Sequence, residues 1–355
     1  MHQKIHMIRT VPALLLLMGS ALFISCRKED TTITNSGKQW LIFDTSNSAL
    51  TGNNITSLWI DEDNQLWATA IDQKLKLDTV VFMGDTIVLG HSEYNNQIIF
   101  ISKLEAQNIF DTLNSPFLKN GKISSIAHHN DAVYAGMSIG DGLWVKRGTE
   151  WSAFYPPGGT AYYFQDFCID ASGRLWFGAG NGGLYSFDGQ SFSQLNELNS
   201  YIPYPAYVID VAYHKTVQWV MTSNALLSNQ FIALSEGGGA MAIDSKGTVW
   251  LARQIIDINN RGELLAFDGV DTTLFQMPVA PSIADMAVDL NDIIWIATDD
   301  GLLKFDGTAW THLDMSNSLL PSNHLTKIRC DEFNNIWIGT SDRGLVAYNP
   351  VGILF

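Results

Sequence analysis

Positive charge is scarce in this chain of 355 residues. Lys and Arg number 21 against 36 Asp and Glu, the formal net charge is −15, and no run of basic residues exceeds two. Nucleic-acid binding depends on Lys and Arg that neutralise phosphates, so this composition excludes DNA and RNA as expected partners. Only 16% of the residues are charged, which argues against long helices that face solvent.

Signals for metal binding are also few. The chain has three cysteines and eight histidines, but no HExxH motif and no Cys/His spacing that is typical of a metal site. We therefore expect no cofactor and no resident metal ion. By contrast, 11 Trp and 29 Gly are present, and this composition favours many short strands joined by turns.

The N-terminus carries an export signal. Residues 1–25 have a basic head and then an apolar stretch from Val11 to Ile24, which is typical of a secretory signal. The junction Phe23-Ile24-Ser25-Cys26 resembles the cleavage box of bacterial lipoproteins. That resemblance implies a lipid on Cys26, a flexible tether over residues 26–37 and contact with the membrane through the lipid alone. Ordinary signal cleavage nearby, with Cys26 incidental, is the alternative.

The charged run Arg27–Asp30 that follows the cysteine is similar to the surface-export signal of Bacteroidota lipoproteins. We therefore expect an outer-membrane or cell-surface lipoprotein that faces the periplasm or the exterior.

An internal repeat of about 40 residues sets the fold. Five segments place an Asp six residues before a Trp: Asp61 and Trp67, Asp170 and Trp176, Asp244 and Trp250, Asp289 and Trp295, Asp331 and Trp337. Two degenerate copies end at Tyr134 and Trp219, which makes seven copies. One carboxylate per turn gives no oxygen cage for calcium, so we interpret these Asp residues as turn caps.

Each copy predicts a blade of four strands. An apolar run, an Asp-x-x-Gly/Asn turn and a second apolar run predict two strands. Three copies continue into Gly-Leu-x-x-Phe-Asp-Gly, as in Gly301 to Gly307, although Glu263 replaces the first Gly in one of them. The Asp-Gly pair predicts a hairpin between the third and fourth strands. Four antiparallel strands in each repeat are typical of a β-propeller.

The two ends of the repeat array predict how the ring closes. Residues 40–57 match residues 310–327 closely, so Trp40–Asp44 reads as a fourth strand with no blade before it. The last repeat has only three strands of its own. We therefore predict an all-β, seven-bladed propeller over residues 38–355, a single domain in which the N-terminal strand completes the C-terminal blade.

The pattern over residues 170–189 resembles the two-component-regulator propeller repeat, which is common in periplasmic sensor regions of Bacteroidota hybrid histidine kinases. The resemblance covers nearly the whole mature chain and implies the fold more strongly than a function. Signalling is not carried over directly from the resemblance, and a detached sensor module that works with a separately encoded kinase is kept as a further alternative.

Long connections predict the binding face. Loops between the second and third strands, and between one blade and the next, open on the same face of a propeller and are longer here than the other turns. They include a hairpin-like excursion over about Ile71–Asn96 and an insertion over Arg253–Gly262. They also carry Tyr155, Tyr162, Tyr163, Tyr201, Tyr204 and Tyr207. Tyrosines there suit a glycan, peptide or protein ligand, or else they brace the loops against neighbouring blades.

Polar residues recur near the mouth of the central channel. Ten residues before each repeat's anchor stand Ser57, Ser124, Asp166, Ile209, Ala240, Asp285 and Lys327. Asp166, Asp285 and Lys327, with Arg329 and the loop residue Arg343, are candidates for contact with a ligand. The alternative is that they only provide polar walls for a channel filled with water.

Two further expectations concern chemistry. Cys168 and Cys330 lie on first strands of different repeats at offsets that point them to opposite sides, so we expect two free, buried thiols. We expect binding without catalysis. The alternative is a metal-assisted lyase or hydrolase similar to the streptogramin lyases, with His324 the one loop histidine near the channel.

Overall fold

A computed structural model describes residues 37–354 apart from eleven short segments: 83–84, 102–109, 114–120, 139–141, 157–162, 180–182, 196–201, 203–206, 230–231, 235–237 and 256–260. Only the backbone is described for residues 73–82, 85–95, 110–113 and 232–234. The expected lipidation site Cys26 and three of the candidate tyrosines, Tyr162, Tyr201 and Tyr204, lie outside the described residues. Within the described part, no helix has the length and apolar character needed to cross a membrane.

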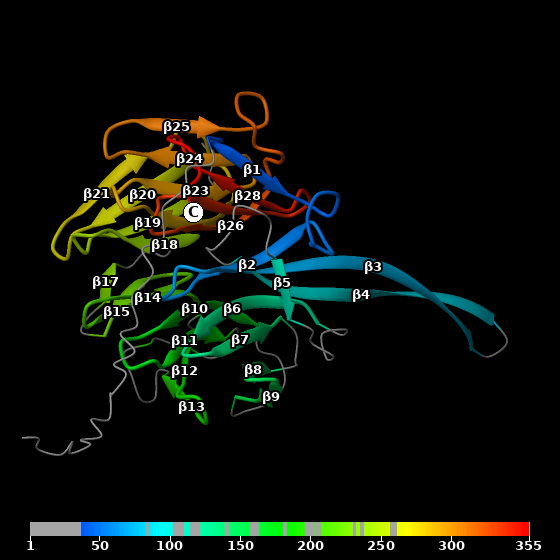
Figure 1. The fold of residues 1–355 in the computed structure, drawn as a ribbon. Coiled ribbons are helices and arrows are strands. Elements are labelled where there is room, and N and C mark those ends of the chain that lie inside the picture. The colour runs from blue at the N-terminus through cyan, green and yellow to red at the C-terminus, as the bar shows by residue number, and fades with distance from the viewer. Residues whose placement is uncertain are drawn as a thin grey trace, which may run out of the picture. The chain divides into compact units, whose positions relative to one another are not determined.

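Seven antiparallel sheets of four strands form a seven-bladed β-propeller (Figure 1). Blade one holds β2 (Asn54–Ile60), β3 (Leu66–Phe82), β4 (Asp85–Ile101) and β5 (Phe110–Leu113). Blade two holds β6 (Ile123–His129), β7 (Ala132–Met137), β8 (Leu143–Arg147) and β9 (Glu150–Phe154). Blade three holds β10 (Phe164–Ile169), β11 (Leu175–Ala179), β12 (Leu184–Phe187) and β13 (Phe192–Leu195).

Blade four holds β14 (Val208–His214), β15 (Val217–Thr222), β16 (Leu226–Ser228) and β17 (Ile232–Leu234). Blade five holds β18 (Ala240–Ile243), β19 (Val249–Ile255), β20 (Arg261–Phe267) and β21 (Thr272–Gln276). Blade six holds β22 (Ile283–Val288), β23 (Ile294–Thr298), β24 (Gly301–Phe305) and β25 (Trp310–Leu313). Blade seven holds β26 (Leu325–Cys330), β27 (Ile336–Thr340), β28 (Leu345–Tyr348) and β1 (Trp40–Phe43).

The blades form a closed ring. The first strands of successive blades contact one another in the order β2, β6, β10, β14, β18, β22 and β26, and β26 contacts β2. Apolar side chains fill the spaces between blades, as where Phe164 and Phe177 of blade three pack with Tyr134 and Leu143 of blade two. The predicted fold and the number of blades are confirmed.

The Asp-to-Trp spacing of the repeat reflects a hydrogen bond. In blade six, Oδ1 of Asp289 accepts from the backbone N–H groups of Asn291 and Ile293, at 2.8 and 3.0 Å, while Oδ2 accepts from the Trp295 indole at 3.1 Å. The same indole bond occurs in all five repeats that have the pair, at 2.7–3.1 Å. Each Asp therefore caps its turn and fixes the Trp of the second strand, as the turn-cap interpretation predicted.

The same turns also tie neighbouring blades together. Asn64, Asp292 and Asn334 each have a positive φ of 57–59°, a conformation that Asn and Asp tolerate better than other residues with a side chain. Their side-chain Oδ1 atoms accept backbone N–H groups at 2.9 Å from the next turn around the ring, those of Glu332, Ser245 and Leu290 respectively.

The N-terminal strand closes the last blade. β1 pairs with β28 from Trp40↔Tyr348 to Phe43↔Leu345, and the Trp40 and Tyr348 rings stack with centroids 4.1 Å apart. Gly344 has a φ of +84°, and a Cβ at that position would lie 2.1 Å from the carbonyl oxygen of Phe43, so only glycine fits beside β1 there. The predicted closure is confirmed.

The predicted excursion in blade one is a long hairpin. β3 and β4 pair continuously from Leu66↔Ile101 to Phe82↔Asp85, whereas β2 pairs with β3 only as far as Ile71. The remainder, residues 72–82 and 85–95, forms a two-stranded arm that leaves the blade (Figure 1). Eleven residues of strand at about 3.3 Å each give the arm a length of about 36 Å.

Candidate functional site

Strand order defines two faces of the ring. In each blade the first strand begins, the second ends, the third begins and the fourth ends on one face, which carries the longer connections and is called the loop face. The opposite face carries the connections between first and second strands and between third and fourth strands, and is called the turn face. The candidate residues are placed below with respect to these two faces.

Polar residues near the start of the first strands join neighbouring blades. The Ser57 hydroxyl oxygen accepts from Ile126 N at 3.0 Å, and the Ser125 hydroxyl donates to Gln165 O at 2.7 Å. Asp285 Oδ2 accepts from Ile328 N at 3.0 Å. Each of these side-chain to backbone hydrogen bonds links one blade to the next, so polar contacts join neighbouring blades at this level of the ring.

Two positions in the predicted inner series were wrong. The residues that pair with the second strand at this level are Ser125 and Asp210, where the fixed offset predicted Ser124 and Ile209. In blade four, His214 pairs with Val217, which leaves a two-residue turn. The regular blades have five residues there, as between Ile243 and Val249. The pairing between the first and second strands of blade four is also shifted by one residue relative to the regular blades. The residue at this level therefore lies nine residues before the anchor Trp219 instead of ten.

Five charged side chains meet at the loop-face half of the first strands. This channel cluster consists of Asp166, Asp210, Asp285, Lys327 and Arg329. Lys327 Nζ lies 2.5 Å from Asp166 Oδ1, and so joins blade seven to blade three across the ring. Arg329 Nη1 lies 2.6 Å from Asp285 Oδ2, and its Nη2 lies 3.6 Å from Asp166 Oδ2. The structure thus brings together four of the predicted site residues and adds Asp210.

The pKa values of two carboxyl groups in the channel cluster shift in opposite directions. Burial alone would raise the pKa of Asp166, but the charges of Lys327 and Arg329 lower it. Asp210 Oδ1 accepts the backbone N–H of Val211 at 2.7 Å. Burial, together with the nearby Asp166 and Asp285 charges, raises the pKa of Asp210 from 3.8 to about 8. With Asp210 protonated, two carboxylates balance two cations. Ionisation of Asp210 therefore adds a third negative charge to the five side chains of the cluster.

Replacing Asp210 with Asn should stabilise the fold at neutral pH. Between pH 4 and 8 the folded protein holds a proton on Asp210 that the unfolded chain releases, so the free energy of unfolding falls as pH rises. An amide removes that dependence. At about 1.4 kcal/mol per pKa unit, we expect Asp210→Asn to gain about 2–4 kcal/mol at pH 7 and much less at pH 5. Urea unfolding at both pH values measures this, and an equal difference at both would contradict it.

The described tyrosines of the loop face are solvent-exposed. Tyr155 follows β9, Tyr163 precedes β10 and Tyr207 precedes β14, and their exposed fractions are 61%, 53% and 56%. Arg343 lies in the connection between β27 and β28 on the same face, with its Nε 3.7 Å from the Asp342 carboxylate. These four residues therefore share a face with the channel cluster but are not part of it.

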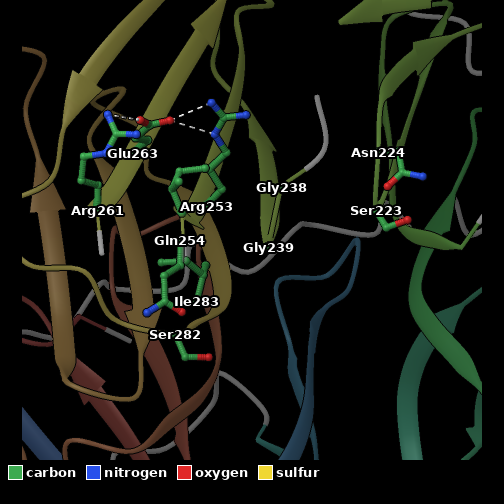
Figure 2. A pocket seen from close by; sticks show the side chains of 11 residues that line it. Ser223, Asn224, Gly238, Gly239, Arg253, Gln254, Arg261, Glu263, Ser282 and Ile283 are labelled. Atoms are coloured by element: carbon green, nitrogen blue, oxygen red, sulfur yellow. Dashed lines mark hydrogen bonds and ion pairs between the residues drawn. The ribbon is translucent and has the colours of Figure 1, made fainter. Parts of the chain in front are cut away.

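A pocket that sequence reasoning missed also opens on the loop face (Figure 2). Its volume is about 790 Å³, and blades four, five and six contribute the residues that line it: Ser223, Asn224, Gly238, Gly239, Arg253, Gln254, Ile255, Arg261, Glu263, Ser282 and Ile283. Figure 2 shows Arg253 and Arg261 directed at Glu263 on one side, with Ser223 and Asn224 across the gap.

The sequence did contain a signal for this pocket. Glu263 stands where other repeats have Gly183 or Gly301, both of which adopt a positive φ at a tight turn. In blade five that turn is replaced by an extension of the hairpin, and Arg253 pairs directly opposite Glu263. The described ends of the insertion that was predicted over Arg253–Gly262 therefore line the pocket with charged side chains.

Cys168 and Cys330 are free, as expected, and their thiol groups are buried although each residue is partly exposed. Cys168 packs with Val208 and Val211 of blade four, whereas Cys330 packs with Trp295 of blade six. They therefore point to opposite sides of their blades, as predicted. Burial raises the pKa of the Cys168 thiol to about 12, so that it stays protonated at neutral pH.

The histidines and two glycine motifs of the sequence are placed by the described strands. His128 and His214 lie at the turn-face ends of β6 and β14, and no group of three His, Cys, Asp or Glu side chains there could hold a metal ion. The strings 136–140 (Gly-x-Ser-x-Gly) and 178–183 (Gly-x-Gly-x-x-Gly) begin at the ends of second strands β7 and β11. The element that follows each is a third strand, whereas both motifs require a helix there.

Sequence comparison finds no matching protein family and no matching curated protein. Among solved structures, the chain is similar to the extracellular domain of a putative hybrid two-component system from B. thetaiotaomicron, with 17% identity and a TM-score of 0.61. The match covers 89% of this chain but only 40% of that one. The likeness shows the fold.

Two other solved structures show the same fold. PorZ, a surface component of the type-IX secretion system of Porphyromonas gingivalis, matches with 15% identity and a TM-score of 0.58, over 86% of this chain and 48% of its own. Virginiamycin B lyase from Staphylococcus aureus matches with 11% identity and a TM-score of 0.62, over 89% and 98%. This chain therefore spans less than half of the first two proteins and nearly all of the third.

Proposed function

We propose that the protein is a non-catalytic binding module of the bacterial cell envelope, which captures a glycan, peptide or protein ligand on its loop face. The observation that carries the proposal is that the described tyrosines, the pocket and the charged channel cluster all lie on one face. A propeller that served only as a scaffold would have no need to gather exposed tyrosines, a polar pocket and a charged cluster there.

The path of the chain supports a surface-anchored module. β1 is a fourth strand, so it begins on the turn face, where the backbone carbonyl oxygen of Lys38 accepts the Ile353 N–H at 2.8 Å. We propose that a lipid on Cys26 anchors the domain through the chain that leads into β1.

The solved neighbours favour an exported recognition role. Two of them are, respectively, an extracellular domain of a two-component system and a bacterial surface component. By analogy, a kinase encoded separately is a candidate partner for this chain. Sensing through such a partner belongs to the proposal, together with outer-membrane or surface localisation.

A ligand screen with matched variants tests the proposal. Libraries of glycans and peptides are presented to the wild type, to Tyr163→Ala/Tyr207→Ala and to Leu290→Ala, in which an exposed apolar residue of the turn face is removed. We expect at least one ligand whose affinity falls about tenfold or more in the tyrosine variant, because an aromatic contact is typically worth more than 1 kcal/mol. We expect Leu290→Ala to bind as the wild type does.

Three results would overturn the proposal. They are an absence of binding by the wild type across both libraries, a loss of binding confined to Leu290→Ala, and chemical turnover of a bound ligand. The last would revive the lyase or hydrolase alternative, and product analysis by mass spectrometry would detect it.

A further inference from the structure

The arm of blade one has an open edge along β3. β4 pairs with one side of β3 as far as Phe82, whereas β2 pairs with the other side only as far as Ile71. Among the described strands, none pairs with that second side over residues 73–81, which are called the arm edge. The backbone N–H and C=O groups of the arm edge that point away from β4 therefore have no strand partner within the described chain.

The arm needs a further strand for its stability. A two-stranded ribbon is at best marginally stable in water, and stability requires a third strand or packing against another element. Two of the usual protections of an exposed edge are missing, because the arm edge contains no proline and β3 pairs with β4 without a bulge along the whole arm. A lipid bilayer supplies no hydrogen-bonding groups to an open edge. We therefore expect the partner of the arm edge to be another β-strand.

The sequence of the arm edge is suited to pair with a second copy of itself. Residues 73–81 are centred on Leu77, so two copies that run antiparallel about a twofold axis at Leu77 overlap over the whole edge. In that register Lys76 of each copy lies opposite Asp78 of the other, and Lys74 lies opposite Val80. Opposite charges in directly facing positions favour pairing, and the twofold axis provides this pair twice.

Other registers and the other edge are less favourable. A twofold axis at Lys76 or at Asp78 would place that residue opposite its own copy, and an axis at Leu75 would place Lys74 opposite Lys76. The β4 side of the arm, residues 85–95, is centred on Gly90. Glycine weakens the interior of a strand, so self-pairing along β4 is disfavoured. Charge and length therefore select one register on one edge.

We propose that two copies of this chain associate by antiparallel pairing of their arm edges, in which Leu77 faces Leu77 and Lys76 faces Asp78 of the other copy. The two arms then form one sheet of four strands, in which the two β3 strands hydrogen-bond to each other. The arm extends away from the blade (Figure 1), so this pairing displaces no described strand of the ring. Self-association of this kind is independent of the proposed ligand binding on the loop face.

Charge reversal on the arm edge tests the pairing. Sedimentation velocity of the purified full chain, from about 1 to 100 µM, should show an equilibrium between monomer and dimer. Asp78→Lys places a lysine opposite Lys76 twice and should weaken dimerisation about tenfold or more, and Lys76→Asp should do the same. An equimolar mixture of the two variants should dimerise again, because each supplies the charge opposite to that of the other. The matched control on β4, Asp85→Lys, changes the net charge as Asp78→Lys does and should dimerise as the wild type does.

Disulfide cross-linking tests the register. Directly opposed residues of an antiparallel pair have Cα atoms about 4.5–5.5 Å apart, which is within the range of a disulfide. Under mild oxidation, Leu77→Cys should therefore give a covalent dimer on a non-reducing gel. Leu75→Cys should not, because the register separates its two copies by about 13 Å. The wild type, which has three cysteines of its own, gives the background.

Four results would overturn the proposal. They are a wild-type chain that stays monomeric over the whole concentration range, polymers in place of a dimer, a mixture of Asp78→Lys and Lys76→Asp that fails to associate, and equal cross-linking of Leu77→Cys and Leu75→Cys. Each of them would leave the proposed ligand binding on the loop face standing.

Discussion

A chain that begins at Ser46, without β1, should lose most of its stability. Removal of Trp40–Phe43 leaves β28 as an open edge, exposes the face that Phe43 covers and deletes the Trp40–Tyr348 stack. Burial of one large side chain contributes about 1.5–3 kcal/mol. The whole strand therefore contributes of order 5 kcal/mol, a large part of the 5–15 kcal/mol typical of a folded domain. We expect the thermal midpoint to fall by roughly 10 °C or more.

Two controls separate ring closure from a general effect of truncation. A chain that begins at Lys38 retains β1 and should have the same thermal midpoint as the wild type. A synthetic peptide of residues 38–47, added to the truncated chain, should restore part of the lost midpoint, because it can pair with β28 as an added strand. An unchanged midpoint in the truncated chain would show that β1 does not hold the ring closed.

Asp289→Ala should be the most damaging single substitution in the repeat motif that we consider. It removes the acceptor of three hydrogen bonds, one of which comes from the Trp295 indole, and Trp295 is only 2% exposed. A buried donor that is left without a partner costs about 1–3 kcal/mol. We expect the free energy of unfolding to fall by about 3 kcal/mol, as measured by urea titration with tryptophan fluorescence.

The matched control lies in the same blade. Asp306 caps the turn between β24 and β25 and accepts three hydrogen bonds from Thr308 and Ala309, but it is exposed to solvent. Water can replace those bonds, so Asp306→Ala should leave the unfolding midpoint close to that of the wild type. Equal losses from the two substitutions would show that turn capping, and not the buried indole bond, explains the conserved spacing within the chain.

The fold could be predicted from the sequence because its physical cause is local and repeated. The spacing from Asp61 to Trp67 encodes one capped turn and one indole bond, and four more repeats contain the same pair. Closure could be predicted because Asp44 and Asp314 cap matching turns, with Oδ1 accepting from Ser46 N and Ser316 N at 2.7 Å. Repetition at both ends of the chain identified the missing strand.

The candidate site was harder to predict from the sequence because it depends on exceptions to the repeat. Asp210 was missed because one turn in blade four is shorter, which moves its strand by one residue relative to the anchor. The pocket was missed because its walls come from three blades, and spacing along the chain does not say which loops face one another. Asp166 and Lys327 were both named, but their contact across the ring follows only from the three-dimensional arrangement.

The account rests on the loop face as the surface that binds. Hydrogen–deuterium exchange, with and without the tightest ligand from the library screen, measures this most directly. We predict slower exchange at the loop-face ends of strands, among them Ser223–Asn224, Arg253–Glu263 and Ser282–Ile283, and unchanged exchange in the turns at Asp244–Thr248 and Asp289–Ile293. Protection confined to those turns, with the loop-face ends unaffected, would contradict it.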